Sequence, residues 1–228
     1  YNVIGKSPIR HDGVDKVTGR ATYGADIKVP GLIWGDVLRS PHAHARILSI
    51  DTSKAESMDG VFAIVTNKDF PNVEEKEVST GEDVVNLKRD QANIMAFDKV
   101  HYKGHVIAGV AAIDRNTAQE AIKKIDVKYE VLKHVSDVDS AMAKDAPIIL
   151  ESLSGDHLGE NVPNTNVAKI FRHEFGDVEQ AFKDSDCVVE RTFTMSMIHQ
   201  GYIEPHNATA VWGQDGKINL WASTQGSF

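Results

Sequence analysis

The chain has 228 residues, of which 41% are hydrophobic, so it can bury a core in one large domain or two modest domains and is not expected to be disordered. Its net charge of -8 and the lack of a Lys/Arg stripe exclude a nucleic-acid surface, and no apolar run approaches the roughly 20 residues of a membrane helix. The single cysteine, Cys187, permits no intramolecular disulfide and cannot ligate an iron–sulfur cluster, which takes about four thiolates.

The first half of the chain is predicted to be rich in strands. Val17–Ile27, with its glycines, suggests an irregular entry segment. Strand patterns follow at Gly31–Ser40 and Ala45–Asp51, joined by a Pro-His-Ala-His turn, and a short buried strand is predicted at Gly60–Thr66. Pro71–Met95 is polar and only weakly periodic, which predicts an extended surface loop.

The clearest unit is a strand, a helix and a second strand. His105–Ile113 is a continuous apolar run of strand length, and Asp126–Leu132 reads as the second strand. Between them, one apolar helical face is formed by residues at i, i+3, i+4 and i+7: Ala118, Ala121, Ile122 and Ile125. Asn116 or Thr117 is predicted as the N-cap of this helix, with Glu120 completing a capping box.

Periodicity fades beyond this unit, and residues 136–166, with their prolines and glycines, are predicted to form a linker. A short helix is expected at Gly176–Asp186. Cys187–Met195 is predicted as a strand, because apolar residues alternate along it, and this places the Cys187 thiol in a buried, inert position.

The last predicted element is a β-hairpin. Its strands are Ala208–Gly213 and Lys217–Thr224, and an Asp-Gly pair between them indicates a two-residue turn. Gln225 follows the second strand and offers both donors and an acceptor, while Gly226 permits a ligand or another backbone to approach closely.

Two histidine-bearing segments were considered as metal sites. His42 and His44 would share one face of a strand, but no other ligand type lies at suitable spacing, so we expect a turn with ordinary hydrogen bonds. His199, Glu204 and His206 surround a proline that excludes a zinc helix, so we expect a polar network that fixes a strand end. No direct metal ligand is predicted, and motifs for dinucleotides, P-loops and serine hydrolases are missing.

Several stretches, taken in this order, resemble one family: "DGVDKVTGRATYGADI", "RSPHAHARILSIDTS", "GVFAIVT", "YKGHVIAGVAAIDRNTAQEAIKKIDVKYEVL", "FGDVEQAFKDSDCVVERTF" and "EPHNATAVWGQDGKINLWASTQGSF". Together they resemble the N-terminal part of the molybdenum-binding large subunit of the xanthine dehydrogenase/aldehyde oxidase family. The amino-acid sequence of the second stretch most resembles the bacterial three-subunit branch that includes 4-hydroxybenzoyl-CoA reductase.

The resemblance implies an α/β (α+β) architecture in two parts. Residues 1–135 would form an α/β hammerhead domain, residues 136–166 a linker, and residues 167–228 the beginning of a molybdopterin-binding domain. The family oxidises N-heterocycles or aldehydes with water as the oxygen source, and one branch reduces aromatic acyl-CoA. The implied cofactor is molybdenum held by molybdopterin in its cytosine dinucleotide form, with [2Fe–2S] clusters and FAD on partner chains.

Few of the family's site residues match positions in this chain. Gln225 matches a glutamine whose amide hydrogen-bonds an oxygen on molybdenum, which makes it the catalytic candidate and, with Gly226, the cofactor-binding candidate. Glu204 and His206 match a recurrent Glu-Pro-His element that we interpret as structural or supporting. The family's other cofactor contacts and its glutamate base lie beyond Phe228, so we expect the chain alone to bind no molybdenum and to be inactive.

Other functions stay open. The hammerhead domain could serve as a non-catalytic docking module for the electron-transfer subunits, or the chain could be a free-standing binding protein. The single cysteine fits a reducing compartment, and the opening residues lack a signal peptide, so we expect a cytoplasmic protein without a membrane span. Because the sequence lacks an initiator Met and stops just after a strand, we expect it to be part of a longer polypeptide. The resemblance implies these partners: the C-terminal part of the large subunit, the iron–sulfur and FAD subunits and a small-molecule substrate.

Overall fold

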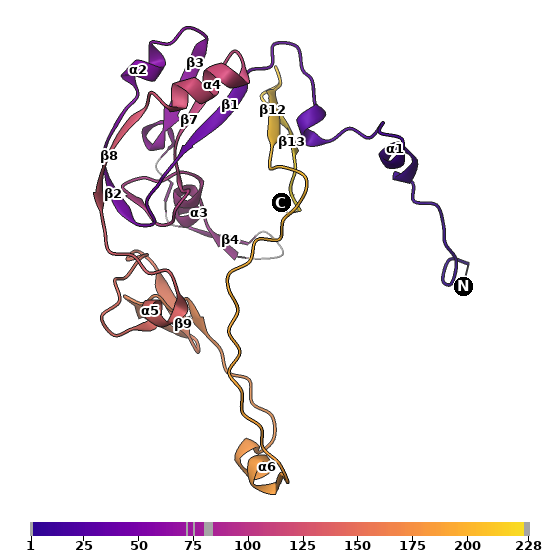
Figure 1. Cartoon of the computed structure of the whole chain (residues 1–228), viewed down its shortest axis with the longest axis vertical. Helices are drawn as coiled ribbons and strands as arrows, with labels where there is room; N and C mark the ends of the chain where they lie inside the picture. Colours follow the sequence, from indigo (N-terminus) through magenta and orange to yellow (C-terminus); the bar gives the residue numbers. More distant parts are fainter. Residues whose placement is uncertain (1, 72, 75, 80–83, 226–228) are drawn as a thin grey trace. The chain divides into compact units, whose positions relative to one another are not determined.

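The chain forms two compact units in the computed structural model, drawn in Figure 1. One unit comprises Ile33–Glu190, and the other comprises Tyr1–Leu32 together with Arg191–Phe228. The structure describes residues 2–71, 73–74, 76–79 and 84–225. No helix within these ranges has the length and apolar character needed to cross a membrane. The mixture of helices and strands confirms the predicted α/β (α+β) class.

The larger unit is built around strand β7 (Val106–Ala112). It is the central strand of an antiparallel sheet, with β1 (Trp34–Arg39) on one side and β3 (Val61–Thr66) on the other. Helix α4 (Arg115–Ile122) follows β7 in the chain and packs against β7 and β1. The continuous apolar run therefore forms a strand, as the sequence predicts, and the structure pairs it on both edges and covers it with a helix.

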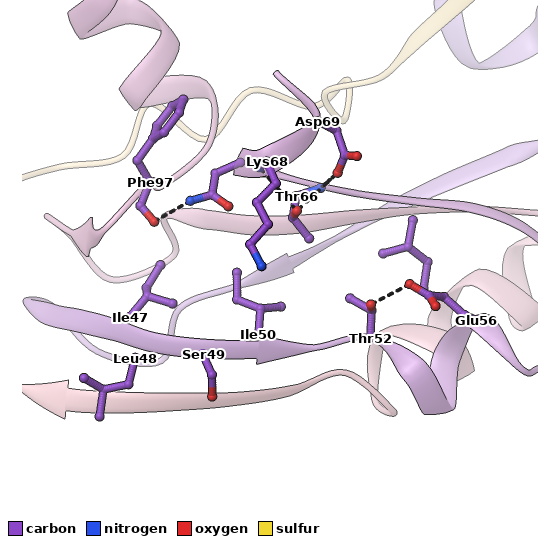
Figure 2. A pocket seen from close by; sticks show the side chains of 12 residues that line it. Ile47, Leu48, Ser49, Ile50, Thr52, Glu56, Thr66, Lys68, Asp69 and Phe97 are labelled. Carbon is purple, nitrogen blue, oxygen red and sulfur yellow. Dashed lines mark hydrogen bonds between the residues drawn. The ribbon is translucent and has the colours of Figure 1, made fainter. Parts of the chain in front are cut away.

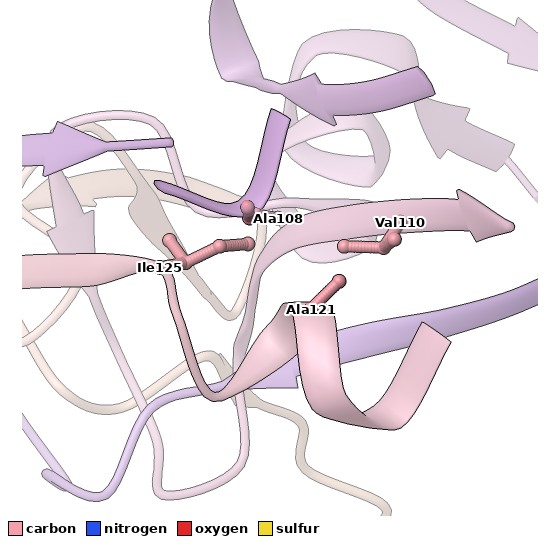
Figure 3. Close-up of a cluster of buried hydrophobic side chains, with 5 residues drawn as sticks. Ala108, Val110, Ala121 and Ile125 are labelled. Carbon is pink, nitrogen blue, oxygen red and sulfur yellow. The ribbon is translucent and has the colours of Figure 1, made fainter. Parts of the chain in front are cut away.

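Small side chains let α4 approach this sheet closely. Ala121 of α4 and Ala108 of β7 are fully buried (Figure 3). Helix α2 (Ser53–Glu56) adds a buried alanine, Ala55. The buried cluster comprises Ala55, Ala108, Val110, Ala121 and Ile125. The predicted apolar face of the helix is confirmed at its two alanines, Ala118 and Ala121, which are both fully buried.

A second antiparallel sheet holds β2 (Ala45–Asp51) between β6 (Lys99–Val100) and β8 (Asp126–Val131). The register between β2 and β8 shifts between Ile47 and Ser49, which is the signature of a β-bulge. A second buried cluster lies under this sheet, made of Ala45, Ala96, Val100 and Ile107. Both predicted strands of this sheet, the one after the histidine turn and the one after the helix, are confirmed.

The predicted N-cap of α4 is wrong. Asp114 is the N-cap, and its Oδ1 accepts a hydrogen bond from the backbone N–H of Thr117 at 2.8 Å. The helix starts earlier than expected because the aspartate carboxylate already satisfies that N–H group. Glu120, which was expected to complete a capping box, accepts a hydrogen bond from Lys123 Nζ instead.

The predicted loop over Pro71–Met95 is also wrong in part. It contains the short hairpin β4 (Glu77–Ser79) and β5 (Val84–Asn86), followed by helix α3 (Leu87–Ile94). The side chain of Asn86 caps the helix by accepting from the N–H of Arg89 at 3.0 Å. None of the helix residues is buried, so the helix carries no strong apolar stripe for the sequence to reveal.

The segment that we predict as a linker contains regular structure. Helix α5 (Val138–Met142) is followed by β9 (Ser154–His157) and β10 (Glu160–Pro163), and β9 also pairs in parallel with β11 (Lys169–Ile170). Asn166 ties these pieces together: its amide donates to the carbonyls of Ala141 and Pro147 at 3.0 Å, and its Oδ1 accepts from the N–H of Ile149 at 3.1 Å. Side-chain hydrogen bonds of this kind leave no periodic trace in a sequence.

The predicted helix after this segment is confirmed as α6 (Val178–Asp184), capped by the Asp177 carboxylate. The strand predicted at Cys187–Met195 is wrong, because the structure has coil there. The Cys187 thiol is exposed rather than buried. Alternation favours a strand only where a neighbouring strand exists, and the described residues pair no strand with this segment.

The smaller unit contains helix α1 (Gly13–Val17), the short 3-10 helix η1 (Gly24–Asp26) and the hairpin of β12 (Ala208–Trp212) and β13 (Ile218–Ala222). The hairpin is confirmed, but its turn is longer than two residues: the N–H of Gly213 donates to the carbonyl of Lys217 at 2.7 Å, which closes a three-residue loop. Within that loop Gly216 has φ of 78°, the left-handed conformation that three-residue hairpins place there.

Substitutions of Ile107 test whether β7 is central to the stability of the larger unit. This side chain is fully buried, so truncation to Ala should lower the free energy of unfolding by about 2–5 kcal/mol, and truncation to Val by about 1 kcal/mol. Urea denaturation followed by circular dichroism measures both. Ile113→Ala, next to the same strand but 57% exposed, is the matched control and should lose less than half as much. Equal losses at the two positions would contradict the placement of the core.

Substitution of Asp114 tests whether this residue, and not Asn116, caps helix α4. The N–H of Thr117 holds the pKa of the Asp114 carboxyl below its ordinary value of 3.8. Because the folded pKa is lower than the unfolded one, the cap stabilises the protein above pH 3.8 and loses this effect as the pH falls through the folded pKa. Asp114→Ala should therefore lower the urea midpoint at pH 7 but not well below the folded pKa. Asn116→Ala should have little effect at either pH.

Candidate functional site

The sequence-predicted site lies at the end of the β12–β13 hairpin. Gln225 follows β13 at a bend in the backbone, and its side chain is exposed. An exposed amide in this position can hydrogen-bond a group that lies outside the chain. Gly226, the second predicted cofactor-binding residue, lies outside the described residues.

Asn207 and Ser223 close the open end of the hairpin just before Gln225. The N–H of Asn207 donates to Ser223 Oγ at 3.0 Å, and the N–H of Ser223 donates to the Asn207 carbonyl at 3.1 Å. Ser223 Oγ and Asn207 Nδ2 also donate to the carbonyl of Pro205, at 3.1 and 2.9 Å. This clamp fixes the backbone two residues before Gln225.

The side-chain oxygen of Asn207 is an unusual feature of this clamp. Oδ1 is buried and has no hydrogen-bond partner within the described part of the chain. A Cβ built on Gly24 of η1 would collide with this oxygen, so a larger residue there would require the Asn207 side chain to shift. A buried acceptor without a donor is destabilising, so the position is suited to an O–H donor from a bound water. Sequence analysis missed Asn207 because one asparagine before a strand carries no distinctive pattern.

Glu204 and His206 are placed near the clamp but do not form it. The imidazole of His206 stacks on the ring of Tyr202, with centroids 4.6 Å apart and planes at 9°, and Tyr202 also contacts His199 at 4.9 Å. Glu204 is exposed. The network expected to fix the strand end exists, but Asn207 and Ser223 provide it rather than the predicted histidines.

The histidines of the first turn are structural, as predicted. His44 is buried, and its Nδ1 lies 2.8 Å from the carbonyl oxygen of Lys133. His42 packs edge-on against Tyr129 with centroids 4.9 Å apart. Across the described ranges, no group of three or more His, Cys, Asp or Glu side chains is arranged to hold a metal ion.

The tertiary structure adds two histidines to His44 that the sequence did not connect with it. The ring of His101 lies 6.3 Å from that of His44 and 5.8 Å from that of His105. Burial lowers the pKa of both His101 and His105, and the neighbouring histidines lower that of His101 further. Burial therefore favours the neutral imidazole at His101 and His105. At His105 the hydrogen bond between Nε2 and the Ala92 carbonyl, at 2.7 Å, acts in the opposite direction, because it raises the pKa.

A pocket of about 420 Å³ opens beside the bulge of β2 (Figure 2). Ile47 and Ile50 point toward Lys68, whereas Leu48 and Ser49 point to the other side of the strand. Strict alternation would send Ile47 and Ile50 to opposite faces, so the bulge is what brings both side chains to the pocket.

Most polar groups of this pocket bond to one another. Thr52 Oγ1 donates to Glu56 at 2.6 Å, and the Asp69 carboxylate caps η2 (Asn67–Asp69) by accepting from the N–H of Thr66 at 2.7 Å. Asn67 Nδ2 donates to the carbonyl of Phe97 at 2.7 Å. The pocket holds no paired nucleophile and base, and none of the predicted site residues lines it, so the hairpin end remains the candidate site.

Comparison with known proteins matches two family models to the chain. Residues 18–133 match the family described as aldehyde oxidase and xanthine dehydrogenase, a/b hammerhead domain. Residues 158–228 match the molybdopterin cofactor-binding domain. The candidate site at the hairpin end therefore falls within the cofactor-binding match.

Similar proteins cover nearly the whole chain. The nicotinate dehydrogenase large molybdopterin subunit of Eubacterium barkeri is 32% identical over 99% of this chain and 48% of its own length. The carbon monoxide dehydrogenase large chain of Afipia carboxidovorans is 35% identical over 91% of this chain and 25% of its own length. The chain thus spans about half of the first of these relatives and about a quarter of the second.

Solved structures agree with the sequence matches. Reconstituted CO dehydrogenase from Oligotropha carboxidovorans superimposes with a TM-score of 0.75 and 33% identity, covering 96% of this chain and 27% of that one. Aldehyde oxidoreductase from Desulfovibrio gigas gives a TM-score of 0.72 and 27% identity over 92% of this chain and 22% of that one.

Ser223 tests the clamp. Ser223→Ala removes both the acceptor for the Asn207 N–H and the donor to Pro205, so the hairpin end should open more often and the Asn207 amide should exchange with solvent at least tenfold faster. Hydrogen–deuterium exchange measures this rate. Ser223→Thr keeps the hydroxyl and should restore slow exchange. Unchanged exchange in Ser223→Ala would show that the clamp does not hold the hairpin end.

Proposed function

Because the chain belongs to the aldehyde oxidase and xanthine dehydrogenase family, we propose that it supplies the N-terminal part of the molybdenum-binding large subunit of a hydroxylase or dehydrogenase. The observation that carries this proposal is the order of the two domain matches, hammerhead and then molybdopterin-binding, along most of the chain. The named relatives are dehydrogenase large subunits, which supports an oxidoreductase role for this chain.

We place the domain division where the sequence changes character. In this division, residues 1–135 form the hammerhead domain and residues 167–228 form the beginning of the molybdopterin-binding domain. Residues 136–166 are the linker that joins the two. The ends of the family matches, at 133 and 158, support a boundary in this region.

The cofactor proposal goes beyond molybdopterin to its cytosine dinucleotide form, with [2Fe–2S] clusters and FAD on partner chains. A single exposed cysteine supports placing the clusters elsewhere, because a cluster takes about four thiolates. When bound, the molybdenum centre supplies two-electron oxidation of a carbon atom with oxygen taken from water. The pocket described above is lined by residues between Ile47 and Phe97 and by none of the hairpin, so we expect the chain to need the remaining polypeptide for cofactor binding and turnover.

One feature of the hairpin end fits such a cofactor. Gln225 is exposed and follows the clamped end of the hairpin, so its amide can donate to an oxygen of the cofactor and steady the charge there. Glu204 and His206 are then supporting residues that shape the approach to the hairpin.

The substrates that we propose are N-heterocycles, aldehydes or, in the reductive direction, an aromatic acyl-CoA. Named similar proteins act on nicotinate, carbon monoxide and aldehydes, which supports a small-molecule substrate without selecting one. We also propose that the enzyme works in the cytoplasm, because the single cysteine fits a reducing compartment.

Gln225 tests the proposed role directly. In the complete enzyme with its partner subunits, Gln225→Ala should lower kcat by about 10²–10³-fold, because a donor to the reacting oxygen is lost, while KM changes little. Dye reduction with N-heterocycles and aldehydes measures both constants. The matched control is Gln214→Ala in the hairpin loop, which should keep full turnover. Full turnover in Gln225→Ala would reject the catalytic role and favour the alternative, a docking module for electron-transfer subunits.

A further inference from the structure

The turn at residues 101–105 joins β6 to β7 and also contacts helix α3. His105 in this turn is fully buried, and its Nε2 lies 2.7 Å from the carbonyl oxygen of Ala92. Because a carbonyl can only accept, Nε2 carries the proton of this hydrogen bond. Nδ1 accepts the backbone N–H of His101 at 3.3 Å. Both ring nitrogens are therefore paired only while the imidazole is neutral.

Tyr102 makes a second connection from the same turn to α3. Its ring stacks on that of His105, with centroids 4.5 Å apart and planes at 17°. Its hydroxyl donates to the carbonyl of Asn93 at 3.3 Å. Ala92 and Asn93 both lie in the last turn of α3, so a change at His105 acts directly on this end of the helix.

Helix α3 depends on such attachments to stay in place. None of its eight residues is buried, so apolar packing holds it only weakly. Gln91 adds a hydrogen bond from its side chain to the carbonyl of Pro71 at 2.5 Å, and Met95, just after the helix, is buried. A helix this short is not stable in water by itself, so the contacts at its C-terminal end decide whether it stays folded against the turn.

The surroundings of the turn favour neutral imidazoles. His101 lies between His44 and His105 in the row described above, and His44 Nε2 is buried without a partner among the described residues. Burial lowers the pKa of His101 and His105 below the ordinary value of 6.5. Asp98 raises the pKa of His101, but this effect is smaller than that of burial or of either neighbouring histidine.

The carboxylates around the turn give little compensation for a charged imidazole. Glu151 already pairs with Lys99 at 2.7 Å, and Asp90 of α3 pairs with Arg89 at 3.6 Å. The other charged or titratable side chains of the neighbouring segments are mostly basic or aromatic: Arg39, His42, Arg46, Lys88, Lys103, Tyr129 and Lys133.

A second proton on His105 would bind at Nδ1, the nitrogen that accepts from His101. Two N–H groups would then face each other, and the hydrogen bond that closes the turn would be lost. The bond to Ala92 favours the charged ring, but burial opposes it by more. A fully buried ring gains water only when its covering moves, and α3, which has no buried residue, is the neighbour least fixed by packing.

We propose that the turn at residues 101–105 is an acid-sensitive latch, which holds α3 in place while its imidazoles are neutral and releases the helix when they are protonated. Residues of α3 also line a cavity of about 380 Å³, together with residues 97–99, 101 and 149–153. Release of α3 therefore opens one wall of this cavity. The latch goes beyond the proposed function and does not depend on it, because it lies entirely within the larger unit.

Hydrogen exchange of the full chain at several pH values tests the latch. Because the folded pKa values of His101 and His105 lie below 6.5, the latch is closed above pH 6.5 and weakens as the pH falls from there toward the folded values. Protection factors, which are corrected for the intrinsic effect of pH on exchange, should fall about tenfold for amides in the last turn of α3 between pH 7 and pH 5.

Helix α4 is the internal control for this measurement. Its cap, Asp114, has a pKa below 3.8 and stays charged over this range, so protection of the α4 amides should change by less than about threefold. An equal fall in both helices, or no fall in α3, would overturn the latch.

The matched variant is the double substitution His101→Gln and His105→Gln. A glutamine amide at position 105 still offers a donor to Ala92 and an acceptor to the backbone N–H of residue 101, but it does not titrate in this range. In this variant, α3 protection should change by less than about threefold between pH 7 and pH 5. His134→Gln, which removes an exposed histidine outside the latch, should keep the full decrease. Wild-type pH dependence in the double variant would overturn the proposal.

Tyr102→Phe separates attachment from pH sensing. It removes the hydrogen bond to Asn93, so it should lower α3 protection at both pH values by a similar factor and leave the pH dependence unchanged. Loss of the pH dependence in Tyr102→Phe would show that the histidines are not the sensor.

A direct titration decides the question even if the double variant does not fold. NMR detection of the imidazole nitrogens in the wild-type chain follows the protonation of His101 and His105 one by one. Protonation should occur over the same pH range in which α3 loses protection. Loss of α3 protection while both rings stay neutral, or protonation of both rings while α3 stays protected, would overturn the proposal.

Discussion

The larger unit depends on strand β7 being paired on both edges and packed by a helix. Its backbone groups pair with β1 and β3, so no edge is left for solvent, and its alanines let α4 approach. Ile107 reaches the second cluster and so links the two sheets. Apolar burial on this scale outweighs the entropy of ordering a short helix and several short strands, none of which is stable alone.

Among its described residues, the smaller unit has no comparable buried cluster. Its hairpin exposes residues of both strands, and the clamp of Asn207 and Ser223 supplies hydrogen bonds rather than buried apolar area. Each hydrogen bond contributes a net free energy of only about 1 kcal/mol, so the clamp can close the end of the hairpin but cannot by itself build a pocket. This shortage of buried apolar area supports our proposal that a cofactor site at the hairpin end needs further polypeptide.

Sequence patterns predicted the elements that are stabilised by apolar periodicity or by turn chemistry. The β7–α4–β8 unit and the C-terminal hairpin were found for these reasons. Helix α3 was missed because its stability comes from the Asn86 cap and not from a buried face. The strand at Cys187–Met195 was predicted from real alternation, but a strand exists only when a neighbour accepts its hydrogen bonds. The hairpin turn was recognised from Asp-Gly, although its closing bond, between Gly213 and Lys217, lies one residue further out on the N-terminal side.

By itself, the sequence determined the family, the α/β class, the order of the two parts and Gln225 as the candidate site residue, because these depend on local order along the chain. Only the tertiary structure showed that Asn207 is a buried acceptor against Gly24 and that three histidines form a row. Those features arise between residues far apart in the chain, where distance depends on packing and not on spacing in the sequence.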